Sequence, residues 1–480
     1  MKKRRLLVLA FIICHLSVSF CALAQKREVH ILSGNDMHAA IEAFPALADI
    51  ADSLRTLYPG LLVLSAGDNR TGEPLNDMYD IPAYPMVALM NQVGFDATTL
   101  GNHEFDSGGR GLARLINLSN FSYICANVHP HDSLGIHLVP CKVFDVEGTR
   151  VGVVGVVELG THGIPDSHPD NVRGFTFTPV GEALSKHEWL RQQCDVVILL
   201  THVGYEADVE LSAAFPWADL IIGGHTHTQI DGGEMHNGLL ITQNVNRLKK
   251  VTHITLVVDG GKVVEKRAEL IDVRQHQGRN KVVAEMLRYF SDNPEFRRVL
   301  TRAAAPFTIE EELGCMMCDA FAAETQCDVA VQNAGGVRYG QKEAGDFTVS
   351  DVLRLDPFGN AAVVMELTGE ELRQLLMACS ANDGYGFPYV SGVQCDVVFD
   401  QRDSLKVKDL RLARPDGSKF DLKRKYRVVT SSYVASIADS PCRDQGRNIN
   451  RKMTDLVIAY LERQEEVNYQ GIRRIQRTWK

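Results

Sequence analysis

Three short, uninterrupted apolar runs constrain the fold more than any other feature of the sequence. They are residues 61–65, 196–200 and 220–222. A strand that is apolar throughout has both faces covered, which is typical of a parallel sheet with helices packed on it. The runs therefore predict an α/β fold in layers, with helical segments between the strands.

Polar side chains of the kinds that bind metal ions follow these strands and two further predicted strands, at 29–33 and 97–100. The carboxyl ends of strands in layered α/β folds lie along one edge, where binding sites form. We therefore expect the five loops to meet there. Together they carry the candidate ligands Asp36, His38, Asp68, Asn102, His202, His225 and His227.

These ligands are carboxylates, imidazoles and an amide, without a thiolate. This set favours divalent Zn, Mn, Fe or Co over a closed structural zinc site. Seven ligands are too many for one tetrahedral ion and suit two ions about 3.5–4 Å apart, bridged by one carboxylate. Two such ions would clamp a phosphate ester and generate the attacking hydroxide. Each loop alone has an ordinary structural explanation, such as a helix cap, so the prediction rests on all five together.

The stretch 100–106 also contains His103 and Asp106. These two side chains can meet around a turn, and a carboxylate partner raises the pKa of an imidazole and keeps it cationic. The alternative is that Asp106 only caps the helix that begins near Gly108. The sequence contains neither a nucleophile elbow nor a P-loop.

Residues 1–24 have the pattern of a signal peptide, with basic residues 2–5, an apolar run at 6–20 and a small-x-small cleavage site at 22–24. The run is short for a membrane span, and no other candidate follows. We therefore expect a protein that is exported to the periplasm or the medium and has no transmembrane segment. Cys21 offers a lipoprotein alternative, to which the preceding Phe20 is a poor fit.

The formal charge is −9, and loss of the four basic leader residues makes it −13. This argues against nucleic-acid polymers and anionic membranes as partners, but not against a small anionic substrate held by metal ions. Most cysteines after the leader lie in apolar runs, so buried free thiols are expected. Cys315 and Cys318 have the spacing of a zinc pair, but no second pair lies nearby. Thiol pairing and oligomeric state stay open.

At 480 residues the chain predicts two domains. Alternating residues at 251–273 predict a hairpin that closes a first domain, residues 25–273. The polar segment 274–300 has a helical pattern and predicts a linker helix. A second α/β domain is expected over 301–480.

These motifs resemble those of the calcineurin-like metallophosphoesterases and, more narrowly, of the 5′-nucleotidase family, which adds a C-terminal nucleotide-binding domain. The resemblance covers essentially the whole mature chain and implies an α/β/β/α first domain. The matching segments are 35–38, 67–69, 101–106, 201–202, 224–227, 333–338, 356–359 and 432–433, with Asp439.

The resemblance also implies roles for single residues. One metal ion would take Asp36, His38, Asp68 and His227, and the other would take Asp68, Asn102, His202 and His225. His103, paired with Asp106, would stabilise the phosphoryl group in the transition state or protonate the leaving alkoxide. Phe358 and Tyr433 would sandwich the base, with Tyr433 where the family commonly has phenylalanine. Asn333, Arg338 and Asp439 would contact phosphate or ribose.

The expected function is that of an exported two-metal phosphohydrolase. It would remove phosphate from nucleoside 5′-monophosphates or related nucleotides by attack of a metal-bound hydroxide. A 2′,3′-cyclic-nucleotide phosphodiesterase with 3′-nucleotidase activity would use the same metal site, so only the second-domain pocket distinguishes the two. An alternative outside the enzymes is a nucleotide-binding scavenging protein.

Overall fold

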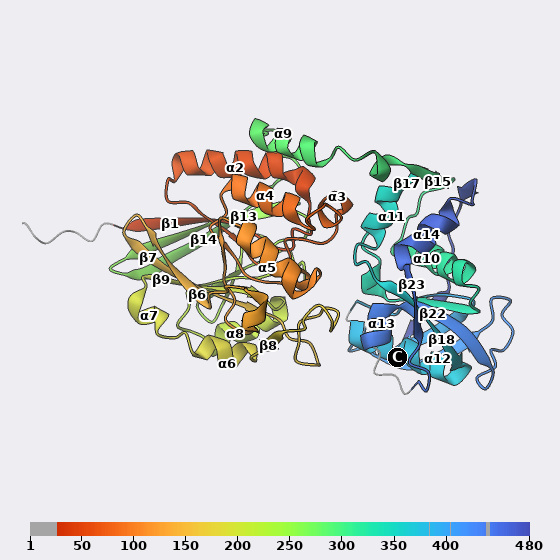
Figure 1. Ribbon diagram of the computed structural model, residues 1–480. Coiled ribbons are helices and arrows are strands. Elements are labelled where there is room, and N and C mark those ends of the chain that lie inside the picture. Colours follow the sequence, from red (N-terminus) through yellow and green to blue (C-terminus); the bar gives the residue numbers. More distant parts are fainter. Residues whose placement is uncertain (1–25, 384, 404, 438–441) are drawn as a thin grey trace, which may run out of the picture.

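The computed structural model describes residues 26–480 except 384, 404 and 438–441, so the predicted leader and Asp439 lie outside the described residues. The chain forms two α/β units (Figure 1). We call them the first unit, from β1 to α9, and the second unit, from β15 to β25.

Two six-stranded sheets form the centre of the first unit. One has the order β14-β13-β1-β2-β3-β4 and the other has the order β11-β12-β10-β9-β7-β6. The strands of the first sheet are β1 (Arg27–Gly34), β2 (Leu62–Ser65), β3 (Ala97–Thr98), β4 (Ser122–Tyr123), β13 (Lys250–Asp259) and β14 (Lys262–Asp272). Those of the second sheet are β6 (Cys141–Val146), β7 (Thr149–Val157), β9 (Val196–His202), β10 (Leu220–Ile222), β11 (Glu234–His236) and β12 (Leu239–Thr242). The strands β5 (Val128–Pro130) and β8 (Phe175–Phe177) form a separate pair.

Helices cover the outer face of each sheet (Figure 1). The first sheet is covered by α2 (Phe44–Leu57), α4 (Tyr84–Val93), α5 (Gly108–Leu118) and α9 (Lys281–Phe290). The second sheet is covered by α6 (Val180–Ser185), α7 (Leu190–Gln193) and α8 (Tyr205–Ala214). A third core lies between the sheets, where Ile31 and Leu64 belong to one cluster with Ile198 and Leu200. This order of layers confirms the predicted α/β/β/α arrangement.

The predicted apolar runs form β2, β9 and β10, and every residue of these strands is buried. The strands β1, β2 and β3 are parallel neighbours, as are β7, β9, β10 and β12. Because parallel strands end at the same edge of a sheet, the loops after β1, β2 and β3 lie together at one edge of the first sheet, and the loops after β9 and β10 lie together at one edge of the second.

Two helical segments differ from what the sequence suggests. Thr178 and Pro179 have the pattern of an N-cap followed by a proline at the first helical position, which suggests one helix to about residue 193. The helix instead begins at Val180, and turns at residues 186–189 break it into α6 and α7. The helix expected over 274–300 is reduced to α9 and a short 3-10 turn at Pro294–Arg297. Because Val283 and Phe290 are buried in the core of the first unit, α9 packs on that unit instead of bridging freely.

The second unit has a five-stranded sheet of order β19-β16-β22-β18-β23, flanked by the three-stranded sheets β17-β15-β24 and β21-β20-β25. Its strands are β15 (Val299–Ala303), β16 (Val329–Gln332), β17 (Gly345–Thr348), β18 (Ala361–Thr368), β19 (Tyr389–Ser391), β20 (Gln394–Phe399), β21 (Val407–Ala413), β22 (Lys425–Ser431), β23 (Arg447–Lys452), β24 (Glu466–Val467) and β25 (Ile475–Trp479). Its helices are α10 (Glu310–Thr325), α11 (Val349–Leu355), α12 (Gly369–Asp383), α13 (Ser432–Ile437) and α14 (Met453–Leu461). Among the described residues, no helix has the length and apolar character needed to cross a membrane.

Most of the predicted buried thiols are found as expected. Cys125, Cys194, Cys315, Cys318 and Cys395 are buried free thiols. Cys141 and Cys327 are free and partly exposed. In Cys315, burial raises the pKa of the thiol to about 12, so this cysteine behaves as a small apolar side chain of α10.

Substitution of Gly155 in β7 tests how closely this strand packs against the backbone at Ile124 in the first unit. A Cβ added there would overlap the backbone carbonyl oxygen of Ile124, which cannot rotate away. We expect Gly155→Ala to lower the free energy of unfolding by about 3 kcal/mol, the upper end of ordinary overpacking. Thermal unfolding would measure this. Gly340→Ala is the control, because a Cβ there meets no atom within 4 Å. Equal midpoints for the two variants would contradict the packing.

Candidate metal centre and adjoining cavity

The loops after β1 and β2 lie side by side and are joined by backbone hydrogen bonds. The Asp36 amide donates to the Gly67 carbonyl at 3.0 Å, and the His38 amide donates to the Asp68 carbonyl at 2.9 Å. Asp36, His38 and Asp68 have φ angles of 48°, 43° and 51°. Left-handed backbone is unfavourable for such residues, and it is found where surrounding contacts enforce it, often at functional sites.

A glycine allows the loop after β2 to touch the loop after β3. Gly67 has a φ of 84°, and a Cβ there would come within 2.7 Å of the Gly101 backbone nitrogen. The two loops therefore pack backbone against backbone. This brings Asp68 next to the stretch that holds Asn102 and His103.

The side chains of these loops converge. Three overlapping groups of three residues could each hold a metal ion. Within each group, the ligand atoms lie within 4.8 Å of one another. The groups are Asp36, His38 and His227; Asp36, Asp68 and His202; and His38, Asp68 and His103. His225 and Asn102 join them, because the His225 backbone amide donates to Oδ2 of Asp36 at 3.0 Å and Nδ1 of His225 lies 3.2 Å from Oδ1 of Asn102. All seven residues predicted as ligands thus lie at one site.

The histidines are oriented as cation ligands are. Nδ1 of His202 lies 2.6 Å from the Ala66 carbonyl oxygen. A carbonyl only accepts, so Nδ1 carries a proton and Nε2 is the nitrogen that faces the carboxylates, 3.3 Å from Oδ2 of Asp68. Within the described part of the chain, this buried Nε2 has no hydrogen-bond partner. Nδ1 of His38 likewise faces the Thr71 carbonyl at 3.1 Å. Metal-binding histidines are held in this way.

The electrostatics of the site favour positive charge. Burial acts to lower the pKa of His202, but the carboxylates of Asp68 and Asp36 outweigh it and raise that pKa to about 10. Burial acts to raise the pKa of Asp68, but the charges of His202 and His103 hold it well below its ordinary value. Buried carboxylates therefore stay ionised and attract cations. The donor set and its orientation fit divalent metal ions.

His103 and Asp106 meet as predicted. Nδ1 of His103 lies 2.9 Å from Oδ2 of Asp106, and the Thr71 hydroxyl donates to the same oxygen at 2.6 Å. The N-cap position of α5 is Ser107, so Asp106 orients the imidazole instead of capping the helix. Burial acts to lower the pKa of His103, but Asp68 and Asp106 raise it above its ordinary value.

Glu104 is a site residue that the sequence motifs did not single out. It is only 2% exposed. Its carboxylate accepts from the backbone amides of Asp68 at 2.9 Å, Gly101 at 2.7 Å and Asn69 at 2.9 Å. Glu104 therefore ties the loop after β2 to the loop after β3. Its one signal in the sequence is its place between His103 and Asp106.

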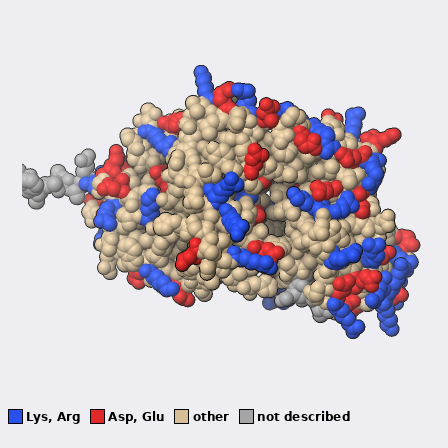
Figure 2. All heavy atoms as spheres, viewed as in Figure 1, with Lys and Arg blue, Asp and Glu red and all other residues tan. Residues whose placement is uncertain are grey.

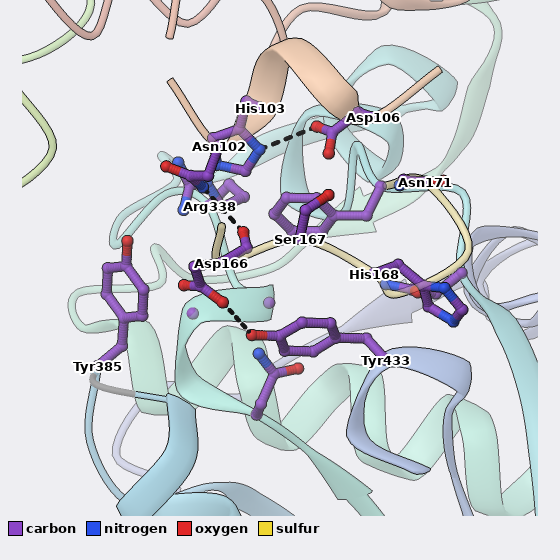
Figure 3. A pocket seen from close by; sticks show the side chains of 15 residues that line it. Asn102, His103, Asp106, Asp166, Ser167, His168, Asn171, Arg338, Tyr385 and Tyr433 are labelled. Carbon is purple, nitrogen blue, oxygen red and sulfur yellow. Dashed lines mark hydrogen bonds and ion pairs between the residues drawn. The ribbon is translucent and has the colours of Figure 1, made fainter. Parts of the chain in front are cut away.

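A cavity adjoins the cluster. Side chains of both units line it (Figure 3). The first unit contributes Asn102, His103, Asp106, Asp166, Ser167, His168 and Asn171, and the second contributes Asn333, Arg338, Phe358, Asn360, Tyr385 and Tyr433. On the face shown in Figure 2, the surface is hollowed between the units, with Lys and Arg side chains beside the hollow.

The predicted substrate residues Asn333, Arg338, Phe358 and Tyr433 all line this cavity. Nη2 of Arg338 lies 3.4 Å from Nε2 of His38, and the Phe358 ring stacks on His103 with centroids 5.7 Å apart. The second unit thus contacts the ligand cluster directly. No motif predicted the contribution of the loop between β7 and β8, which brings Asp166 into the cavity.

Two family models match the chain. Residues 30–229 match the calcineurin-like phosphoesterase model, and residues 290–441 match the model of the 5′-nucleotidase C-terminal domain. The 5′-nucleotidase of Vibrio cholerae is 26% identical over 440 residues, which are 79% of this chain and 77% of the relative. A trifunctional nucleotide phosphoesterase of Bacillus subtilis is 24% identical over 476 residues, covering 86% of this chain but spanning only 32% of the relative's length. The crystal structure of a 5′-nucleotidase precursor from Thermus thermophilus shares the fold, with a TM-score of 0.82, 23% identity, and coverage of 94% of this chain and 99% of that one.

The fold, the ligand cluster and these matches define a metal-dependent phosphoester hydrolase of the calcineurin-like class. Because a 5′-nucleotidase C-terminal domain follows the phosphoesterase domain, the chain belongs to the 5′-nucleotidase family.

The Glu104→Gln variant tests whether this carboxylate holds the two loops of the ligand cluster in position. The variant replaces an acceptor oxygen by a donor that faces backbone N–H groups. We expect it to cost about 1.5–3 kcal/mol of stability, the value of hydrogen bonds to a charged group, and to lower metal occupancy. Elemental analysis and thermal unfolding would measure both. Glu182→Gln, at an exposed carboxylate paired with Lys186, is the control. Full metal content in Glu104→Gln would contradict this role.

Proposed function

We propose that the protein is a two-metal phosphohydrolase that removes phosphate from nucleoside 5′-monophosphates. One observation carries the proposal: a single cavity holds Asn102 and His103 of the cation-binding cluster together with the aromatic rings of Phe358 and Tyr433. A nucleotide has the matching layout, with an anionic phosphate, a ribose and a flat base. The names of the relatives as nucleotidases and nucleotide phosphoesterases support the same substrate class.

We assign the ligands to two sites that share Asp68. Asp36, His38, Asp68 and His227 would hold one ion, and Asp68, Asn102, His202 and His225 would hold the other. Bound there, Zn, Mn, Fe or Co ions would supply charge to grip phosphate oxygens and to lower the pKa of a water molecule. The Asn102 side-chain amide donates to the Asp166 carbonyl at 3.1 Å, which turns Oδ1 of Asn102 towards His225.

His103 and Arg338 would act on the phosphoryl group. Because Nδ1 of His103 faces Asp106, Nε2 is the nitrogen directed at the cluster, 4.0 Å from Oδ2 of Asp68. There it can stabilise the developing charge or give a proton to the leaving ribose oxygen. The guanidinium of Arg338 forms a fork suited to phosphate oxygens.

The second unit would hold the nucleoside. Phe358 and Tyr433 would stack on the base, a contact that every base can make, so base specificity would be broad. Asn333 lines the same cavity. The predicted contact from Asp439 lies outside the described residues and stays a prediction.

We also propose that the protein is exported, on the strength of the signal-peptide pattern at residues 1–24. The mature chain would then consist of a metallophosphoesterase domain, residues 25–273, and a nucleotide-binding domain, residues 301–480. The segment 274–300 would connect them.

The activity is tested with metal-free protein to which Mn²⁺ or Zn²⁺ is restored. We expect phosphate release from 5′-AMP, and less from 3′-AMP and 2′,3′-cyclic AMP. Release from the latter two alone would support the phosphodiesterase and 3′-nucleotidase alternative. Failure to release phosphate from any nucleotide, with metals bound, would contradict the proposal and favour a non-catalytic binding protein.

The neighbours Asn102 and His103 should behave differently. We expect Asn102→Ala to lower metal occupancy, because it removes a proposed ligand. His103→Ala should keep both metals and lower kcat by about 10²–10⁴, the usual worth of a general acid. Elemental analysis and steady-state kinetics separate the two effects. His129→Ala, on the exposed side of β5, should change neither. Equal metal loss in the Asn102 and His103 variants would refute the assignment of Asn102 as a metal ligand and His103 as a catalytic residue.

A further inference from the structure

We propose that Asp166 recognises the ribose, its carboxylate accepting hydrogen bonds from the 2′- and 3′-hydroxyls, so that the enzyme prefers ribonucleotides over deoxyribonucleotides. This inference rests on the proposed function, and adds a residue of the first unit to substrate selection.

The position of Asp166 is the first argument. Its carbonyl oxygen accepts from the Asn102 side chain at 3.1 Å, and its Oδ1 accepts from the Tyr433 hydroxyl at 2.7 Å (Figure 3). Asn102 belongs to the proposed metal centre, and Tyr433 is a proposed base platform. Asp166 therefore spans the distance between the phosphate end and the base end of the cavity. The ribose of a bound nucleotide occupies the same interval.

The hydrogen-bonding capacity of Asp166 is the second argument. A carboxylate has about four acceptor positions on its two oxygens. Among the described residues, the Tyr433 hydroxyl makes the one hydrogen bond to this carboxylate. The remaining acceptor positions of the Asp166 carboxylate can receive hydrogen bonds from a ligand, and the hydroxyls are the donors that a ribose offers. A 2′-deoxyribose lacks one of them.

Asp166 is also held in place, as a recognition group must be. Its backbone amide donates to Oε1 of Glu158 at 2.5 Å, so contacts to Glu158, Asn102 and Tyr433 fix it from three sides. A phenylalanine in place of Tyr433 could stack on a base but could not donate to Asp166. The Tyr433 hydroxyl therefore helps to orient the Asp166 carboxylate.

The test is steady-state kinetics of the metal-loaded enzyme with 5′-AMP, 2′-deoxy-5′-AMP and 3′-deoxy-5′-AMP. For wild type we expect kcat/KM for 5′-AMP to exceed that for the deoxy analogues by about ten- to a hundredfold, as for a lost hydrogen bond to a charged group. Asp166→Ala should abolish the difference by raising KM for 5′-AMP, with kcat little changed, because the contact is made equally in ground and transition states.

Three further variants sharpen the test. Asp166→Asn keeps the shape and an acceptor oxygen, and should retain part of the discrimination. Tyr433→Phe keeps the ring but frees Asp166, and should weaken discrimination. Asp170→Ala removes an exposed carboxylate of the same loop, paired with Arg173 at 2.7 Å, and should keep the wild-type ratio.

The inference is overturned if wild type treats 5′-AMP and 2′-deoxy-5′-AMP alike, or if Asp166→Ala keeps the wild-type ratio. Equal loss on both substrates in Asp166→Ala would also overturn it, since that indicates a structural role only. If Asp166→Ala does not fold, the wild-type ratio and Asp166→Asn decide. Failure of wild type on every nucleotide would instead refute the proposed function, so the two failures are distinguishable.

Discussion

The burial of two carboxylates, Asp36 and Asp68, is the constraint on which the rest of the site depends. Asp36 is fully enclosed and Asp68 is 2% exposed. Charge taken out of water is costly unless it is compensated by opposite charge and hydrogen bonds. The imidazoles of His202, His38 and His227 lie 3.3–4.0 Å from these carboxylates and give part of that compensation. Divalent cations would complete it, so a site of this composition suits metal ions.

Backbone contacts hold the charged groups together. The left-handed conformations of Asp36 and Asp68 are unfavourable, and the amide-to-carbonyl bonds between their loops maintain them. Glu104 adds a third buried carboxylate, which accepts from backbone amides of the two loops that follow β2 and β3. The chemistry of the site thus rests on loops that are fastened to rigid sheets, so that His103 is presented at a defined distance from Asp68.

The candidate metal ligands and the proposed substrate-binding residues come from different units. The ligand cluster belongs to the first unit, whereas Arg338, Phe358 and Tyr433 enter the cavity from the second. Two contacts join the units: the Tyr433 hydroxyl donates to Asp166 in this cavity, and Arg354 of α11 pairs with the buried Glu73 at 2.5 Å. Because the proposed substrate residues lie across this interface from the ligand cluster, changes in the second unit would alter which nucleotide is accepted without disturbing the proposed metal centre.

The sequence by itself determined the layered α/β class and the residues that gather at the cluster. Apolar runs such as 61–65 indicated buried strands, and the polar residues that follow them were the candidate ligands. Asp68 follows β2 of one sheet and His202 ends β9 of the other, so their approach to 3.3 Å also depends on how the two sheets face each other. The break between α6 and α7 and the docking of α9 could not be read in this way, because both depend on packing against other elements. Only the tertiary structure decided the roles of Glu104 and Asp166. Asp166 meets Tyr433 across 267 residues, and no local pattern encodes a contact that arises from how two units face each other.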